Sequence, residues 1–291
     1  MPNWVPFLAL TVFSLFLLAY TISKNREKSH LIFLFWLFIC GLAFLFEFII
    51  FILFKSYEYD PGILVNQYSD SVLGSIVSQA FAVPVAITFI VVTNLRIRAI
   101  IFIIGLFFMI ETLFLYLEVY VHYWWRSIFT SMFLILTVIL SKLWWNSLDK
   151  DRSHYINFTT LFFAMLALTQ TGGWILSSLL GLYELPIPAF TEEMRNNITG
   201  NFAYLFFSSY LYSLIIYYRN RELPFTIMTV VFLTTIEIAM ADRGILSVKE
   251  PVYILVLPAL HFLLIQTGRH VYRRYFKLFP DTSQKRLPRH E

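Results

Sequence analysis

The sequence predicts an all-α polytopic membrane protein, a transmembrane helix bundle of about nine helices. The first observation is composition: of 291 residues, 58% are hydrophobic and only 14% are charged, and the mean hydropathy is +0.69. Soluble domains carry about 25% charged residues. The second observation is that the apolar residues form long unbroken runs, unlike the short alternating segments of a membrane β-barrel. Cys40 is the only cysteine, which excludes a disulfide-rich secreted scaffold.

Nine runs are long enough to be spans, since a helix needs about 20 mostly apolar residues to cross a hydrocarbon core of about 30 Å. The runs cover residues 4–22, 31–54, 72–93, 99–117, 127–146, 156–181, 201–218, 223–241 and 251–268. No basic residue precedes the first run, and Lys24, Arg26 and Lys28 follow it directly. We therefore interpret it as an uncleaved first helix rather than a secretory signal.

The distribution of basic residues predicts the orientation. Short cytoplasmic loops hold an excess of Lys and Arg. With the N-terminus outside, 17 of the 22 basic residues fall in the inner loops and in the C-terminal tail, and each inner loop obeys the rule separately. We therefore expect a multi-pass protein of the plasma membrane with a cytoplasmic C-terminus. The basic cytoplasmic face suits anionic lipids of the surrounding lipid bilayer, and no nucleic acid is expected as a partner.

The chain carries signs of an internal duplication. Residues 57–111 and 183–237 align without a gap at an offset of 126, and Glu111 matches Glu237. The alternative is that two hydrophobic stretches align by composition alone. Each copy holds four spans, so the two repeats would have the same orientation in the membrane. The predicted organisation is an N-terminal transmembrane helix over 1–29, a first four-helix repeat over 30–150, a second over 151–268 and a basic cytoplasmic tail over 269–291.

Three carboxylates lie inside predicted spans: Glu47, Glu111 and Glu237. A carboxylate at the centre of a lipid-exposed helix costs about 2.5–3.5 kcal/mol, so we expect these side chains to face protein or water. Helical rise places all three in the outer half of the bilayer. We expect them to converge on one outward-facing pocket that binds a small cation or polar ligand. The alternative is that each bonds a neighbouring helix and only specifies packing.

Four further residues extend the predicted ligand-binding set. Glu118 and His122 follow Glu111 at spacings of seven and four, which places them on one helical face if the fourth span extends that far. Asp60 and Asp70 lie in the first outer loop. Oxygen ligands suit Mg²⁺, Mn²⁺ or Ca²⁺, and a nearby His would admit Zn²⁺. No dense metal motif selects among these ions, and the sequence identifies no cofactor.

The sequence leaves the question of catalysis open. It contains no serine-hydrolase elbow, phosphate-binding glycine loop, zinc-protease helix or nucleotide fingerprint. The first hypothesis is therefore a ligand-binding centre with a role in transport, sensing or binding. The second is a membrane-embedded enzyme acting on lipid or prenyl substrates, with Glu111 and Glu237 as acid or base. The third is a non-catalytic membrane scaffold. His261, near the middle of the last span, is either a carboxylate partner or a core donor.

Short elements along the first half carry a resemblance to known sequences. They are Glu47, Tyr59-Asp60-Pro61-Gly62, Asp70-Ser-Val-Leu-Gly74, Pro84, Glu111 and His122-Tyr-Trp-Trp125. In these elements the chain resembles an uncharacterised family of multi-pass membrane proteins from spore-forming Firmicutes. The second half retains Glu184, Gly200 and Glu237 but lacks the Asp-Pro-Gly and His-Tyr-Trp-Trp elements. Because that family has no assigned activity, the resemblance implies a bacterial plasma membrane and no particular reaction.

Overall fold

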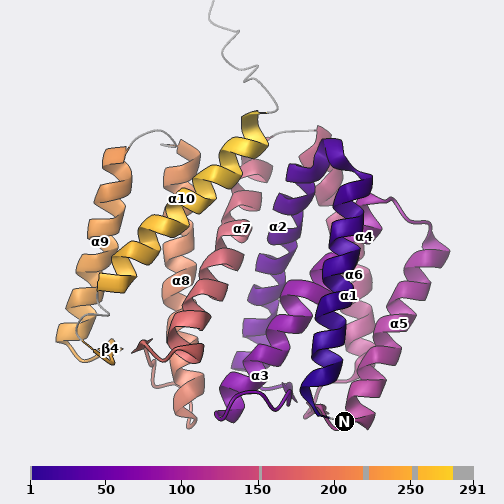
Figure 1. Ribbon diagram of the computed structural model, residues 1–291, viewed down its shortest axis with the longest axis horizontal. Helices are drawn as coiled ribbons and strands as arrows, with labels where there is room; N and C mark the ends of the chain where they lie inside the picture. The colour runs from indigo at the N-terminus through magenta and orange to yellow at the C-terminus, as the bar shows by residue number, and fades with distance from the viewer. Residues whose placement is uncertain (1, 151–152, 219–222, 251–254, 278–291) are drawn as a thin grey trace, which may run out of the picture.

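The computed structural model describes residues 2–150, 153–218, 223–250 and 255–277, and these ranges are mostly helical (Figure 1). The long helical segments are α1 (Trp4–Lys24), α2 (Ser29–Glu47) with the π-helical η2 (Phe48–Leu53), α3 (Gln67–Ile76) with η3 (Val77–Ala82) and α4 (Val83–Val92), α5 (Ile97–Tyr116), α6 (Ser127–Lys150), α7 (His154–Trp174) with η4 (Ile175–Leu179), α8 (Glu193–Tyr218), α9 (Leu223–Asp242) and α10 (Val256–Lys277). A short 3-10 turn, η1 (Arg26–Lys28), joins α1 to α2. Each predicted span falls on one segment, although residues 251–254 of the ninth lie outside the described ranges.

Seven of these segments are long and apolar enough to cross a membrane, counted over the described residues. This finding agrees with the predicted membrane-embedded, multi-pass protein. Helices α8 and α10 are not among the seven. The reason for α8 lies in its surroundings, because polar side chains such as Asn197, Asn201 and Ser209 are buried against other helices. A helix enclosed by protein does not need an apolar surface toward lipid.

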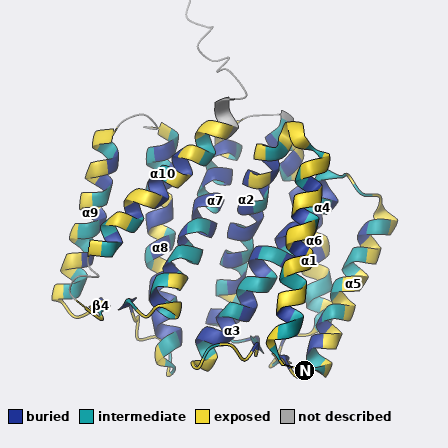
Figure 2. Ribbon diagram, viewed as in Figure 1, coloured by how far each residue is buried: buried dark blue, intermediate teal, exposed yellow. Residues whose placement is uncertain are grey.

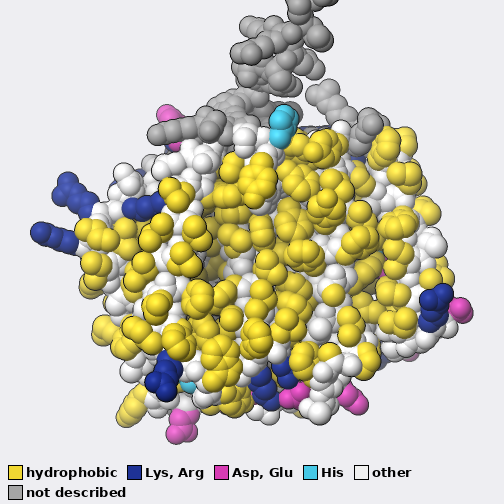
Figure 3. Space-filling model, turned by 180° about the vertical axis from the view of Figure 1, so that it is seen from behind, with side chains coloured by type: hydrophobic (Ala, Val, Ile, Leu, Met, Phe, Trp, Pro, Cys, Tyr) yellow, Lys and Arg dark blue, Asp and Glu magenta, His cyan; other side chains and the backbone are white. Residues whose placement is uncertain are grey.

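The helices divide into an interior group and a peripheral group (Figure 2). In the most apolar window of the α3–α4 segment 61% of the residues are buried, compared with only 17% in the corresponding windows of α5 and α6. The peripheral helices expose large apolar side chains, and Phe16 of α1 is 73% exposed. Figure 3 shows one broad hydrophobic face, with the charged side chains mainly near its rim. Such a surface is expected where lipid is the solvent.

Two short antiparallel strand pairs lie at the end of the bundle where α1 begins, which we call the strand end (Figure 1). Strand β1 (Tyr57–Tyr59) pairs with β2 (Tyr120–His122), and β3 (Tyr183–Glu184) pairs with β4 (Ser247–Val248). Helix α5 ends at Tyr116, and Glu118 turns the chain with a φ of 58°. The helix therefore does not reach His122, and the single helical face expected for Glu111, Glu118 and His122 does not form. The chain reverses instead and pairs with β1.

Local structure recurs at the spacing of 126 residues found in the sequence. Tyr57 lies opposite His122 in the first pair, and Tyr183 opposite Val248 in the second, so both register positions differ by 126. The positive φ of Glu118 recurs at Gly244. The π-helical segments η2 and η4 also coincide at this spacing. These agreements are independent of side-chain identity, because strand register and backbone dihedrals are properties of the main chain.

Side-chain hydrogen bonds recur at the same spacing. Oδ1 of Asp70 accepts bonds from the backbone N–H groups of two consecutive loop residues, and Oδ1 of Asn196 does the same in the second half. The four donors are Ile63 and Leu64 for Asp70, and Ala189 and Phe190 for Asn196, and each pair differs by 126. Both side chains close the loop that leads into a helix, so the amide serves as well as the carboxylate in this local role.

Arg195 of α8 joins the two halves at the strand end. Its guanidinium donates to the backbone carbonyls of Ile52 at 2.7 Å and Leu53 at 3.0 Å, where η2 ends. Nearby, Nζ of Lys55 lies 2.8 Å from Oε1 of Glu192. The end of a helical segment leaves backbone carbonyls without intrahelical partners, and these bonds from Arg195 satisfy two of them. Arg195 is itself buried.

Candidate functional site

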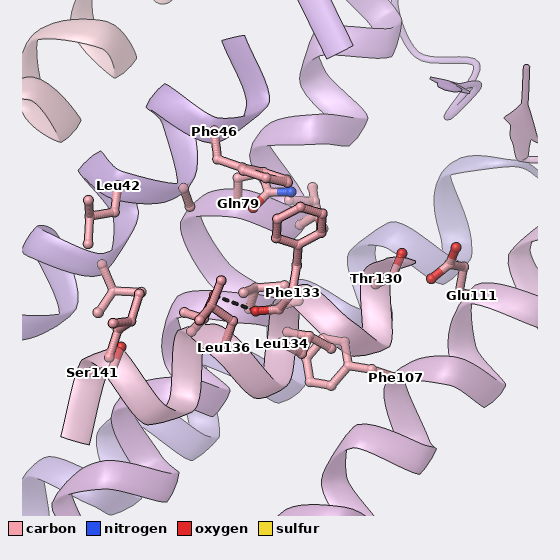
Figure 4. A pocket seen from close by; sticks show the side chains of 18 of the residues that line it. Leu42, Phe46, Gln79, Phe107, Glu111, Thr130, Phe133, Leu134, Leu136 and Ser141 are labelled. Atoms are coloured by element: carbon pink, nitrogen blue, oxygen red, sulfur yellow. Dashed lines mark hydrogen bonds between the residues drawn. The ribbon is translucent and has the colours of Figure 1, made fainter. Parts of the chain in front are cut away.

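A partly enclosed cavity of about 690 Å³, which we call the groove, is lined mainly by α2, η3, α5 and α6, with further residues from α1 and α7 (Figure 4). Its lining is mostly aromatic and aliphatic, and Figure 4 shows Phe46 and Phe133 near the centre. Glu111 and Thr130 lie together toward one end, and Ser141 lies toward the other. The volume falls in the range of about 300–1,000 Å³ that is usual for small-molecule sites.

One wall of the groove is a single face of α6. The lining residues of this broad face recur at helical spacing: Thr130, Phe133, Leu134, Leu136, Thr137, Leu140, Ser141, Leu143, Trp144 and Ser147. From Thr130 to Ser147 is 17 residues, or about 26 Å at 1.5 Å per residue. The groove therefore extends along most of a hydrocarbon core of about 30 Å. Its length favours a ligand with a long apolar chain.

The polar end of the groove is formed by Glu111, with His122 beside it. Glu111 lies on the buried face of α5, and β2 returns His122 so that its Nε2 is 3.0 Å from Oε1 of Glu111. Their contact lacks hydrogen-bond alignment, and neither atom has another hydrogen-bond partner among the described residues. Partial burial lowers the pKa of His122 below its ordinary 6.5, against the opposing pull of the Glu111 carboxylate. Within the described residues, these two atoms therefore have only each other as a polar neighbour, and the Glu111 carboxylate is the acidic group that lines the groove.

Glu47 lies behind an aromatic wall of the groove. Its Oε2 accepts hydrogen bonds from the hydroxyl of Tyr57 at 2.6 Å and from Nε2 of Gln79 at 2.9 Å. Tyr57 and Gln79 line the groove, whereas Glu47 lines a second, smaller cavity. The rings of Tyr59 and Tyr120, with centroids 4.6 Å apart, stack beside Tyr57. Glu47 and Glu111 therefore belong to one neighbourhood but face different spaces.

Glu237 belongs to a separate centre in the second half. Its Oε1 lies 2.7 Å from Nε2 of His261 and accepts a hydrogen bond from the hydroxyl of Tyr204 at 2.9 Å. The other ring nitrogen of His261 contacts the hydroxyl of Tyr212. Glu237 is not among the residues that line the groove. The structure thus brings Glu47 and Glu111 near each other and leaves Glu237 apart, while the pairing of His261 with a carboxylate is confirmed.

The remaining residues of the predicted set have other surroundings. Asp70 is buried, and its carboxylate accepts bonds from backbone N–H groups of the loop before α3. Asp60 is exposed and bonds Asn3, and Glu118 is exposed in the turn after α5. Within the described ranges, no three His, Cys, Asp or Glu side chains are arranged to hold a metal ion. None of these three acids, Asp60, Asp70 and Glu118, is among the residues that line the groove.

Sequence reasoning did not select Tyr57, Gln79 or Tyr204, which supply the hydrogen bonds to the buried acids. Tyr57 follows Glu47 by ten residues, and its hydroxyl reaches back only because β1 folds against the end of η2. Gln79 is the one amide within the third predicted span, so it could have been chosen by the rule that polar side chains inside a membrane need partners. No such signal marks either tyrosine.

Comparison with known proteins adds no relationship: no family model, no curated protein and no solved structure matches this chain.

Proposed function

We propose that this protein binds an amphipathic ligand from the bilayer, with an apolar chain in the groove and a polar head group at Glu111 and His122. The observation that carries the proposal is the combination of a long apolar groove with the Glu111 carboxylate at one end, where His122 lies 3.0 Å from it. A small hydrophilic solute would leave most of this lining without a favourable contact. A hydrocarbon chain, in contrast, would fill it by apolar contact.

The chemistry of the polar end indicates the kind of head group. The Glu111 carboxylate is an acceptor, and a neutral imidazole at His122 offers one donor and one acceptor. A head group that donates hydrogen bonds or carries positive charge, such as an amine, would bind favourably to the Glu111 carboxylate. An anionic head group would place like charges together in a low-dielectric site, which is unfavourable. We therefore expect a long-chain amine to bind more tightly than a fatty acid of the same length.

Tryptophan fluorescence tests the proposal directly, because Trp125 and Trp144 both line the groove. A long-chain amine that carries bromine on its chain should quench this emission saturably in the purified full-length protein. Glu111→Gln should weaken binding at least tenfold, or about 1.4 kcal/mol. Thr137→Phe, which fills the middle of the groove, should prevent quenching. The matched control is Glu118→Gln, at an exposed acid in the turn after the same helix.

The outcomes separate the proposal from its rivals. Wild-type binding in both Glu111→Gln and Thr137→Phe would refute a ligand in the groove and favour the scaffold hypothesis. If only Thr137→Phe loses binding, the hydrocarbon chain of the ligand lies in the groove as proposed, but Glu111 does not bind the head group. Equal affinity for the amine and for the fatty acid would contradict the charge argument.

A second candidate function, an enzyme acting on a lipid or prenyl substrate, is favoured by the 3.0 Å approach of His122 to Glu111. A neutral histidine beside a carboxylate is an arrangement suited to proton transfer. The same ligand would then be chemically changed rather than only held. Under this hypothesis His122→Gln abolishes turnover of added lipids, followed by mass spectrometry, while binding persists. Unchanged lipids after incubation with wild-type protein would refute it.

The architecture and orientation belong to the same proposal. The recurrence of strand register, positive φ and loop-closing bonds at a spacing of 126 supports two parallel four-helix repeats after one extra helix. The excess of basic residues at the other end supports a cytoplasmic location for that end, against anionic lipids, with the strand end outside. The resemblance to the Firmicutes family supports a bacterial plasma membrane as the location. A cysteine introduced at exposed Glu118, in a variant without Cys40, should react with an impermeant reagent added outside the cell.

A further inference from the structure

A second cavity of about 80 Å³, which we call the interface cavity, lies between the two halves. It is bordered by the ends of α2 and α3, by η2, by the end of α7 with η4, and by α8. Its polar lining residues come from both halves: Glu47, Ser75, Gln170, Thr171, Ser177, Ser178 and Asn201. Three segments around it depart from regular α-helix, because η2 and η4 border it directly and η3 begins immediately after Ile76. Single-turn π-helical distortions occur frequently at functional sites.

Two buried oxygen atoms in this lining have no hydrogen-bond partner among the described residues. They are Oε1 of Glu47 and Oδ1 of Asn201, and the two residues are only 4% and 6% exposed. Oε2 of Glu47 is occupied by Tyr57 and Gln79, which line the groove, so the free Oε1 is the oxygen left for the interface cavity. Nε1 of Trp174, a donor in the same lining, is also unpaired. Unpaired buried polar atoms in a polar cavity indicate an occupant.

The partners of the three intramembrane acids differ in one respect. Glu111 has His122 at 3.0 Å, and Glu237 has His261 at 2.7 Å. Glu47 has no Lys, Arg or His within ion-pair distance among the described side chains, although it is as deeply buried as the other two. A buried carboxylate without a counter-charge is strongly disfavoured. Glu47 must therefore either bind a proton or take a positive charge from outside the chain.

The second half shows that the fold does not need this acid. At the spacing of 126, Glu47 corresponds to Gly173, Gln79 to Leu205, and only Tyr57 has a like residue, Tyr183. A Cβ added at Gly173 would meet the side chain of Leu205 and the hydroxyl of Tyr183, so the three positions are neighbours there as well. The second half thus forms the corresponding local structure with a glycine in place of Glu47 and a leucine in place of Gln79. Packing alone does not account for Glu47.

We propose that the interface cavity binds a small monovalent cation, with Na⁺ the best fit, through Oε1 of Glu47 and Oδ1 of Asn201. A water molecule in the remaining space would accept from the indole N–H of Trp174. A single carboxylate among neutral oxygen donors suits one positive charge, whereas Mg²⁺ and Ca²⁺ sites generally use more carboxylates or retain more water. Backbone and neutral oxygens beside interrupted helices are a known Na⁺ environment in membrane proteins. This proposal does not depend on the ligand in the groove.

The experiment compares melting temperatures of the purified full-length protein in NaCl, KCl and choline chloride at equal ionic strength. Wild-type protein should be stabilised saturably by Na⁺, by several degrees, and not by choline. Glu47→Gln keeps the size and the acceptor for Tyr57 but removes the charge, so it should abolish the difference between the salts. The matched control Glu118→Gln should retain it. Asn201→Ala should weaken the response while the carboxylate stays in place.

Several results would overturn the proposal. One is a wild-type melting temperature that is the same in all three salts. Another is an Na⁺ response that persists unchanged in Glu47→Gln. A response to pH alone that depends on Glu47 would assign a proton, not a cation, to the cavity. If Glu47→Gln does not fold, equilibrium binding of radioactive Na⁺ to wild-type protein decides, and absence of saturable binding refutes the site.

Discussion

Replacing Tyr57 by phenylalanine removes one of the hydrogen bonds to the buried Glu47 carboxylate. The Tyr57 hydroxyl donates to Oε2 of Glu47 at 2.6 Å, and both side chains are less than 5% exposed. The chain supplies its own control in Tyr183, the corresponding residue of the second half. Tyr183 is buried to 5% exposure, and its hydroxyl makes no such bond to a carboxylate within the described residues. The two substitutions remove the same atom from equivalent positions on the strands.

The expected magnitude follows from the bond that is lost. Hydrogen bonds to charged groups in proteins contribute about 1.5–3 kcal/mol, because they are charge-assisted. Measured bonds between membrane helices average about 0.6 kcal/mol and reach about 1.7 kcal/mol. Since Tyr57 supplies one of the two bonds that Glu47 receives, we expect Tyr57→Phe to lower the free energy of unfolding by about 1–2 kcal/mol. Tyr183→Phe should cost less than about 0.5 kcal/mol.

Equilibrium unfolding by SDS in mixed micelles, followed by tryptophan fluorescence, measures both values. A double-mutant cycle of Tyr57→Phe with Glu47→Ala, which removes the acceptor, then isolates the interaction between the two side chains. The cycle should give a coupling energy of about 1 kcal/mol, since contacting residues are not additive. Equal losses of stability for Tyr57→Phe and Tyr183→Phe, or additivity in the cycle, would refute a stabilising hydrogen bond between Tyr57 and Glu47.

Two further predictions concern packing and pH. Gly41→Ala places a Cβ against the backbone carbonyl of Phe163, where α2 meets α7. It should therefore lower the free energy of unfolding by about 1–3 kcal/mol in the same SDS assay. The control Gly105→Ala, with open space around the added Cβ, should not destabilise the protein. The hydrogen bond from Lys55 lowers the pKa of Glu192 from 4.5 to about 2. Its stabilisation is therefore complete above pH 4.5 and is lost as the pH falls through about 2. Because the pair is more than a third exposed, Lys55→Met should cost under about 1 kcal/mol at neutral pH and nothing below pH 2.

The positions of the helices could be predicted from the sequence because a membrane span is a local property. Twenty apolar residues in a row satisfy their own backbone hydrogen bonds and require no distant partner. For the same reason the burial of Glu47, Glu111 and Glu237 followed from their place within apolar runs, and all three are buried. The spacing of 126 was likewise readable along the chain, although the extent of its agreement in backbone geometry was not.

The sequence by itself determined an all-α, multi-pass protein with three buried acids and an asymmetric charge distribution. The tertiary structure decided which partner each acid has. His122 reaches Glu111 through a strand, His261 reaches Glu237 from another helix, and Glu47 receives only neutral donors. It also separated the groove from the interface cavity. These facts depend on contacts between residues far apart in the chain, and such contacts are set by the packing of whole helices rather than by any local pattern.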